Sequence, residues 1–170
     1  MKAIDFRHDL LPLKDILFRV ALRITTDTAE AEDVTQETLL RVWNRRDDLH
    51  DVRSLEAYCL TICRNLALDR SAKSEARNLS LDEHAVDPVD TGFTADEQMV
   101  RRERLRWVHT LFNRLPEKQR SVIQLRDIEG KSYRETADIL GISEDQVRVT
   151  LFRARQAIRK QFEKIDNYGL

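Results

Sequence analysis

Glycine and proline are both scarce in this sequence: its 170 residues include four glycines and three prolines. Because these residues mark turns and break helices, their scarcity favours long helices over a turn-rich β fold. No apolar run approaches the roughly 20 residues that a membrane-spanning helix requires. The opening stretch, MKAIDFRHDLLPLKD, is too charged for a secretory signal. We therefore expect a soluble, cytoplasmic, all-α protein without a membrane insertion.

Cysteine is equally rare, with Cys59 and Cys63 as the only two. Their four-residue spacing on a predicted helix suits neither a disulfide framework nor a zinc site, which needs about four ligands. We expect two buried free thiols, no metal and no cofactor. An enzyme built on His50, Cys59 and Cys63 is disfavoured, because no base–nucleophile pair or ligand set accompanies them.

Charge is spread unevenly along the chain, although the net charge is −1. Residues 1–75 carry a net charge of −2, residues 76–97 of −5 and residues 98–170 of +6. Segregation of this kind indicates segments with different partners. The basic C-terminal part suits a polyanion, although a charge run is also typical of a solvated face.

The acidic middle of the chain has the composition of a linker. It contains Pro88 and Gly92 among small polar residues and acids, and it shows no helical period. We therefore predict a helical unit at 1–77, a linker at 78–97 and a second helical unit at 98–170.

The C-terminal unit contains two capping boxes, which mark helix starts. Ser132 and Glu135 form the first box, at the start of a short helix. Ser143 and Gln146 form the second. Gly141 lies between the two helices and suits the left-handed residue that ends a helix. Two helices joined by so short a turn predict a helix-turn-helix, a DNA-binding motif.

The second helix of this motif has a buried stripe and a separate polar face. Steps of four, three and four residues connect the stripe: Val147, Leu151, Ala154 and Ile158. The other face and its flanks carry Asp145, Arg148, Val149, Phe152, Gln156, Arg153, Arg155, Arg159 and Lys160. An aromatic ring that points away from the buried stripe is unfavourable in water unless another group packs over it. Phe152 therefore either meets thymine methyl groups in a major groove or packs on the preceding helix, and both interpretations stay open.

The stretch AEDVTQETLLRVW, residues 31–43, is predicted to form a two-sided helix. A wheel at about 100° per residue places the core side at Ala31, Val34, Thr38, Leu39, Val42 and Trp43. The other side carries Asp33, Gln36, Glu37, Leu40 and Asn44. One leucine among acids and amides is typical of a small protein-docking patch with a polar rim. Because acids repel DNA phosphates, we expect a protein partner with a basic surface.

A third helix is predicted over SLEAYCLTICRNLALDRSAKSEAR, residues 54–77. Its core positions are Leu55, Tyr58, Cys59, Ile62, Leu66 and Leu68. Its surface positions are Arg64, Asn65, Asp69, Arg70 and Lys73. The polar residues can read bases or solvate the helix, and spacing alone favours solvation.

Three stretches, AEDVTQETLLRVW, SLEAYCLTICRNLALDR and LPEKQRSVIQLRDIEGKSYRETADILGIS, resemble a bacterial RNA polymerase sigma factor of the extracytoplasmic-function (ECF) group. They occur in the family's order and at its separations, over about residues 8–163. The resemblance implies a region-two domain and a region-four helix-turn-helix domain joined by a linker. It implies promoter-specific transcription initiation, with no catalysis by this chain.

The resemblance also implies a site for core polymerase. Asp33, Gln36 and Glu37 match the family's Asp-x-x-Gln-Glu motif, which docks on the clamp coiled coil of the largest catalytic subunit. Leu40 shares their stripe by wheel geometry. Region four is expected on the flap of the second-largest subunit. An anti-sigma factor is expected to cover the same surfaces, in the cytoplasm or at the inner membrane.

Promoter DNA is the other implied partner. Asn65 matches the position that captures an unstacked base of the −10 element, and the loop at about 50–54 matches the wall of the base pocket. We assign four further residues to this interface: Ser54, Arg64, Asp69 and Arg70. The linker matches a segment that threads through polymerase, where its acidity would make it a stand-in for nucleic acid.

The −35 element is the implied target of the second unit. Arg148 and Phe152 match −35 contacts, and Arg153 matches a phosphate contact. We add Val149 and Arg155 to this set. The helix departs from the family at 146–151, where it reads QVRVTL and many members read TVKSRL, which puts the usual −35 preference in question.

A stand-alone transcriptional regulator is the alternative, because similar helix-turn-helix sequences occur in that class. Its N-terminal helices would dimerise or sense a ligand. A dimerisation face should be apolar, whereas Asp33, Gln36 and Glu37 are polar and acidic. The acidic stripe therefore favours the sigma factor.

Overall fold

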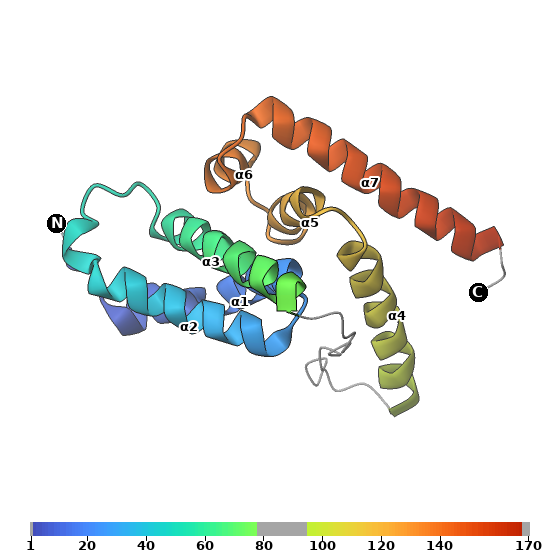
Figure 1. The fold of residues 1–170 in the computed structure, drawn as a ribbon, viewed down its shortest axis with the longest axis horizontal. Coiled ribbons are helices and arrows are strands. Elements are labelled where there is room, and N and C mark those ends of the chain that lie inside the picture. Colours follow the sequence, from blue (N-terminus) through green and yellow to red (C-terminus); the bar gives the residue numbers. More distant parts are fainter. Residues whose placement is uncertain (1, 78–94, 168–170) are drawn as a thin grey trace.

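The computed structural model describes residues 2–77 and 95–167, and these ranges contain helices and no strand. The predicted all-α fold is confirmed. The α-helices are α1 (Lys14–Thr25), α2 (Thr28–Asn44), α3 (Leu55–Arg77), α4 (Ala95–Asn113), α5 (Glu117–Ile123), α6 (Tyr133–Leu140) and α7 (Glu144–Asn167) (Figure 1). Shorter helical turns span Phe6–Leu10, Leu11–Leu13, Arg46–Asp48 and Gln124–Ile128. No described helix combines the length and the apolarity that a membrane crossing requires.

The N-terminal unit is a bundle in which α1, α2 and α3 pack against one another (Figure 1). Each helix buries one apolar face, with these side chains fully enclosed: Leu17, Val20 and Ile24 from α1, Val34 and Val42 from α2, and Leu60 and Cys63 from α3. Asp27 caps α2 by accepting a hydrogen bond from the Glu30 N–H at 3.0 Å. The cap fixes where α2 begins, and the periodicity of its buried apolar residues decides which face points away from the bundle.

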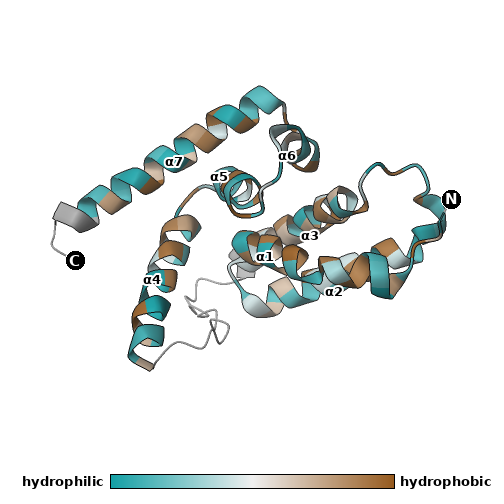
Figure 2. Cartoon of the chain, turned by 180° about the vertical axis from the view of Figure 1, so that it is seen from behind, coloured by the Kyte–Doolittle hydropathy of each residue, from teal (hydrophilic) through white to brown (hydrophobic). Residues whose placement is uncertain are grey.

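The C-terminal unit contains both predicted capping boxes. The Ser132 hydroxyl accepts from the Glu135 N–H at 3.0 Å, and the Ser143 hydroxyl accepts from the Gln146 N–H at 3.1 Å. Gly141 ends α6 with φ 67°, the left-handed conformation expected of it. Hydrophobic and hydrophilic colours alternate along α7 (Figure 2). Its predicted buried stripe is confirmed: Val147, Leu151, Ala154 and, at the edge of the core, Ile158.

The two units pack on each other, with α1 against α5 and α3 against α6. Arg19 on α1 donates two hydrogen bonds to the Glu129 carboxylate, at 2.6 and 2.8 Å. Gln124 connects this pair to a second arginine: its Nε2 donates to Glu129 at 3.1 Å, and its Oε1 accepts from Arg23 Nε at 2.9 Å. A polar network thus joins the units beside their shared apolar core.

Arg120 on α5 adds a further connection between the units. Its guanidinium donates to the backbone carbonyls of Arg23 at 3.0 Å and Ile24 at 3.2 Å, in the last turn of α1. Burial, and then the charge of Arg120, lower the pKa of Arg23 to about 10. Lys131 forms an ion pair with Glu56 at the contact of the second unit with α3.

The predicted linker at 78–97 overlaps the start of α4, which begins at Ala95. Asp96 and Glu97 lie in the first turn of that helix. Carboxylates there face the positive end of the helix dipole, so acids that read as linker are also favourable helix starters. The expectation of a non-helical segment is therefore wrong for 95–97. The rest of the linker lies outside the described residues, and the division into units stays a prediction.

Candidate functional site

α2 presents the predicted polar stripe to solvent. Asp33 and Gln36 are exposed, Leu40 is 57% exposed, and Glu37 is half-buried. The opposite side packs into the bundle through Ala31, Val34, Thr38, Leu39 and Val42, with Trp43 partly buried at its edge. The two-sided character expected of this helix is confirmed, and its acids and its one apolar side chain remain accessible to a partner.

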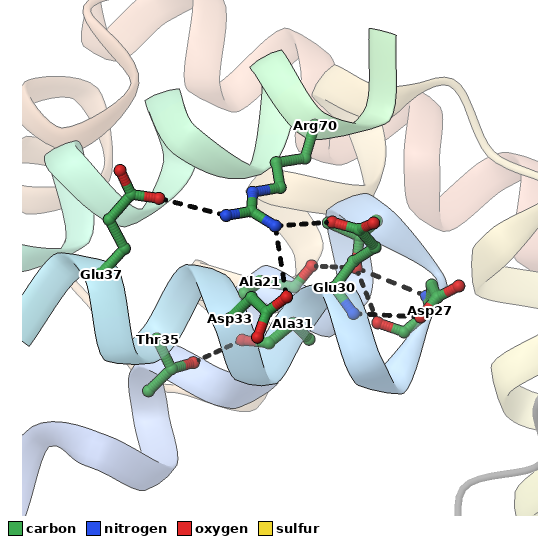
Figure 3. Close-up of polar contacts among 9 residues, drawn as sticks. Ala21, Asp27, Glu30, Ala31, Asp33, Thr35, Glu37 and Arg70 are labelled. Atoms are coloured by element: carbon green, nitrogen blue, oxygen red, sulfur yellow. Dashed lines mark hydrogen bonds and ion pairs between the residues drawn. The ribbon is translucent and has the colours of Figure 1, made fainter. Parts of the chain in front are cut away.

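Arg70 reaches from α3 across to this stripe (Figure 3). Its Nη1 donates to Glu30 at 3.1 Å and to Asp33 at 3.4 Å, and its Nη2 donates to Glu37 at 3.2 Å. Arg41 donates to the other carboxylate oxygen of Glu37 at 2.8 Å. Burial alone would raise the pKa of Glu37, but the hydrogen bonds from the two arginines outweigh it and hold that pKa below its ordinary value.

Among the predicted −10 residues of α3, Asn65 and Asp69 are exposed as expected. Arg64 is not: its side chain is 13% exposed, and its Nη2 lies 3.5 Å from the Glu117 carboxylate at the start of α5. The expectation that Arg64 lies on the surface is therefore wrong, because the second unit packs over it. In this arrangement Arg64 is covered while Asn65 is accessible.

Ser54, at the end of the predicted base-pocket loop, caps α3. Its hydroxyl oxygen accepts a hydrogen bond from the Ala57 N–H at 3.1 Å. The hydroxyl is exposed and keeps its own proton to donate. The sequence analysis did not predict this cap, which gives a structural reason for a serine at position 54.

α7 exposes the apolar part of its predicted reading face. Val149 is 48% exposed and Phe152 is 63% exposed, and Arg153 is exposed beside them. The interpretation in which Phe152 packs on the preceding helix is wrong. Exposed apolar side chains on the second helix of a helix-turn-helix suit thymine methyl groups in a major groove.

Two arginines of the same predicted set already have partners within the protein. The Arg148 guanidinium lies over the Tyr133 ring, 4.8 Å from its centroid, and 3.3 Å from the Asp145 carboxylate. Arg155 donates two hydrogen bonds to Asp127, at 3.0 and 2.6 Å. Both arginine side chains are about half exposed and open to solvent screening, but the two-pronged Arg155 pair has the stronger geometry and connects α7 to the turn that follows α5.

Two family models match parts of this chain. Residues 12–77 match the family model described as Sigma-70 region 2, and residues 105–158 match Sigma-70, region 4. The ECF RNA polymerase sigma factor SigL of Mycobacterium tuberculosis is 35% identical over 153 residues, which cover 88% of this chain and 84% of SigL. The chain belongs to the ECF sigma factors.

A second relative of this sigma factor is the probable RNA polymerase sigma factor RfaY of Xanthomonas campestris. It is 33% identical over 158 residues, which cover 88% of this chain but 38% of RfaY, so the chain spans well under half of that relative. The sigma factor RpoE of Bartonella quintana, crystallised with the anti-sigma factor NepR, shares the fold with a TM-score of 0.72 at 24% identity, covering 94% of this chain and 97% of that one. Family membership sets aside the stand-alone regulator.

The two thiols of this sigma factor are free and buried, as predicted. Burial raises the pKa of Cys59 and of Cys63 to about 12. Since the thiolate is the reactive form, burial should keep both thiols protonated and unreactive near pH 8. We expect iodoacetamide at that pH to leave both cysteines unmodified in the folded protein and to modify both in guanidinium chloride, measured by intact mass. Rapid alkylation of the folded protein would contradict their burial.

Sequence reasoning missed the residues that connect the units: Arg19, Arg23, Arg120, Gln124 and Glu129. Arg19 and Glu129 are 110 positions apart, a separation at which no helical spacing rule applies. One signal was available, since Arg19 and Arg23 lie four residues apart on a helix whose other residues are mostly apolar. Two cations on one side of such a helix indicate a polar partner outside the bundle.

Proposed function

We propose that this sigma factor binds core RNA polymerase and directs it to promoters whose −35 and −10 elements it reads. The observation that carries the proposal is the exposed stripe of Asp33, Gln36, Glu37 and Leu40 on α2. Its acids, its amide and its one apolar side chain suit a basic protein surface with a small apolar contact. The clamp coiled coil of the largest subunit is the partner of this stripe, and the flap of the second-largest subunit receives region four.

The −10 element is read from the N-terminal unit. Asn65 offers both amide donors and a carbonyl acceptor to the edge of a base that has left the stack. Extruding that base costs a few kcal/mol, which contacts to its edge and the wall at 50–54 offset. Arg64 joins this interface only after Glu117 has moved away, since the two side chains are in contact in the packed arrangement.

The −35 element is read from α7. Val149 and Phe152 meet thymine methyl groups, while Arg148 exchanges its contact with Asp145 for a guanine edge. Arg153 on the flank takes a phosphate, which positions the helix without reading sequence. Arg155 remains with Asp127 and holds the helix in place.

The two units part when both elements are bound. Positions −35 and −10 are about 25 base pairs apart, which corresponds to about 85 Å of B-DNA at ~3.4 Å per base pair. The longest of the described helices, α7 with 24 residues, is about 36 Å long at ~1.5 Å per residue. A separation more than twice the length of that helix favours units that part over units that stay in direct contact. The connecting residues 78–94 extend to about 60 Å at most, which allows them to thread through polymerase between the separated units.

An anti-sigma factor controls the protein by covering these surfaces, in the cytoplasm or at the inner membrane. The fold shared with RpoE, which was crystallised with the anti-sigma factor NepR, supports this part of the proposal. A partner that keeps the units packed would leave Arg64 covered. It would also prevent the protein from binding the −35 and −10 elements at the same time.

Run-off transcription with core RNA polymerase on genomic fragments tests the proposed function. Addition of the purified protein should produce new transcripts whose mapped start sites share two upstream elements. Core enzyme alone is the control for background initiation. Failure to change the start sites, with a folded protein and active core, would contradict the proposal.

Arg148→Ala tests the assignment of the −35 reader. We expect it to alter the preferred −35 sequence and to cost about 1–3 kcal/mol on the best site, because a two-pronged contact to guanine is lost. Binding would be measured against a panel of single-base −35 variants. A uniform loss across the panel would mark Arg148 as a phosphate contact instead.

A further inference from the structure

Arg70 lies in a position that differs from the −10 role we assigned to it. We assigned it to the −10 DNA, yet its guanidinium contacts three carboxylates of α2 (Figure 3). Two of them, Asp33 and Glu37, belong to the proposed polymerase-docking stripe. The third, Glu30, lies one turn before that stripe.

The spacing of the acids explains why one arginine reaches all three. Glu30, Asp33 and Glu37 are three and four residues apart, so they form one row along α2. Like charges in such a row repel one another, and a guanidinium offsets this with several donors held in a rigid plane. Arg70, from the neighbouring helix, supplies that group at 3.1, 3.4 and 3.2 Å.

Glu37 is the most constrained member of the row. Arg70 holds one of its carboxylate oxygens at 3.2 Å and Arg41 holds the other at 2.8 Å. The side chain of Glu37 is still 34% exposed, so a partner can reach a carboxylate whose orientation is already set. Asp33, with 62% of its side chain exposed, has the weaker contact at 3.4 Å.

A phosphate contact would remove Arg70 from this arrangement. Its side chain is 32% exposed, and transferring its guanidinium to DNA would leave three acids facing one another without their shared cation. The net effect would weaken the docking stripe at the moment when polymerase and promoter are both bound. The contacts therefore favour a protein role over a DNA role.

We propose that Arg70 is a positioning residue of the polymerase-docking surface: it holds the Glu37 carboxylate in the orientation that the basic partner surface meets, and it makes no contact with promoter DNA. This inference rests on the proposed function of the α2 stripe. It acts through Glu37, so it changes how long a docked complex lasts more than how often one forms.

The test compares Arg70→Ala, Arg70→Lys and Lys73→Ala for binding to core polymerase, measured by surface-immobilised kinetics at physiological salt. Lys73 is the matched control: it is exposed on the same helix, with no ion pair among the described residues. Arg70→Ala should speed dissociation about tenfold with little change in association, as expected for a lost orienting contact. Arg70→Lys should not restore the slow dissociation of the wild type, because a compact ammonium cannot contact three carboxylates at once. Lys73→Ala should match the wild type.

A double-mutant comparison separates positioning from general stability. If Arg70 acts through Glu37, its removal should have little further effect in a Glu37→Gln protein. Additive losses would mark Arg70 as a purely structural residue and overturn the proposal. Circular dichroism establishes that each variant is folded, and Arg70→Lys carries the comparison if Arg70→Ala is too unstable.

Promoter binding by the assembled holoenzyme tests the opposite possibility, that Arg70 contacts DNA. A DNA contact would leave core binding unchanged in Arg70→Ala and reduce the salt slope of promoter binding by about one unit. That result, or full rescue by Arg70→Lys, would overturn the positioning role while leaving the proposed function intact. A wild-type protein that fails to bind core polymerase would instead refute the proposed function, and this inference with it.

Discussion

Glu37→Lys is expected to abolish stable association with core RNA polymerase while leaving the helical bundle folded. The substitution places a cation between Arg41 and Arg70, where a carboxylate now accepts from both. Loss of one partner of a close charge pair at an interface costs about 2–5 kcal/mol, so the affinity should fall by about thirtyfold to several thousandfold. Co-purification with tagged core enzyme and competition against the wild-type protein both measure the effect.

Glu32→Lys is the matched control for that experiment. Glu32 is exposed on the same helix, about 100° around the axis from Asp33 and outside the stripe. The change in net charge is identical, so a general electrostatic effect would appear in both variants. Equal binding by Glu37→Lys and the wild type would show that polymerase docks elsewhere.

Glu129→Arg is expected to separate the two units in the free protein. The Glu129 side chain is 5% exposed and accepts hydrogen bonds from Arg19 and Gln124. Its replacement leaves Arg19, Arg23 and a new arginine together without this carboxylate. Breaking a buried pair costs about 3–5 kcal/mol, which we reduce to about 2 kcal/mol because Arg19 is half exposed.

Small-angle X-ray scattering should detect the separation as a larger radius of gyration, at unchanged helix content by circular dichroism. Glu163→Arg provides the control, since Glu163 is exposed far along α7 and makes the same change in charge. An unchanged radius for Glu129→Arg would mean that the apolar contacts between the units suffice to hold them. Accessibility of Arg64 would then not depend on this network.

Local spacing was sufficient to predict α2, α6 and α7 and the buried and exposed faces of α2 and α7. The boxes at Ser132 and Ser143 and the stripe from Val147 to Ile158 were predicted because their partners lie within four residues. The same holds for the α2 stripe. Helical periodicity identifies the polar face of a helix, because that face depends only on residues close to one another in the sequence.

The partners of the arginines could not be predicted in the same way. Arg64 meets Glu117, Arg70 meets the α2 row, and Arg155 meets Asp127, contacts that span between 28 and 53 positions. A surface arginine that binds DNA and one that binds a distant carboxylate have the same local sequence. The intramolecular partners of these arginines appear only once the helices are packed, and their DNA contacts stay predictions.

Arg120 makes the end of helix α1 depend on the contact between the two units. α1 ends at a left-handed Thr26, with φ 56°, and the carbonyls of its last turn depend on outside donors. Arg120 of the other unit supplies those donors at Arg23 and Ile24. One unit therefore completes a helix of the other. When the units part, the end of α1 should fray and its amides should exchange faster with solvent, two residues before α2 begins.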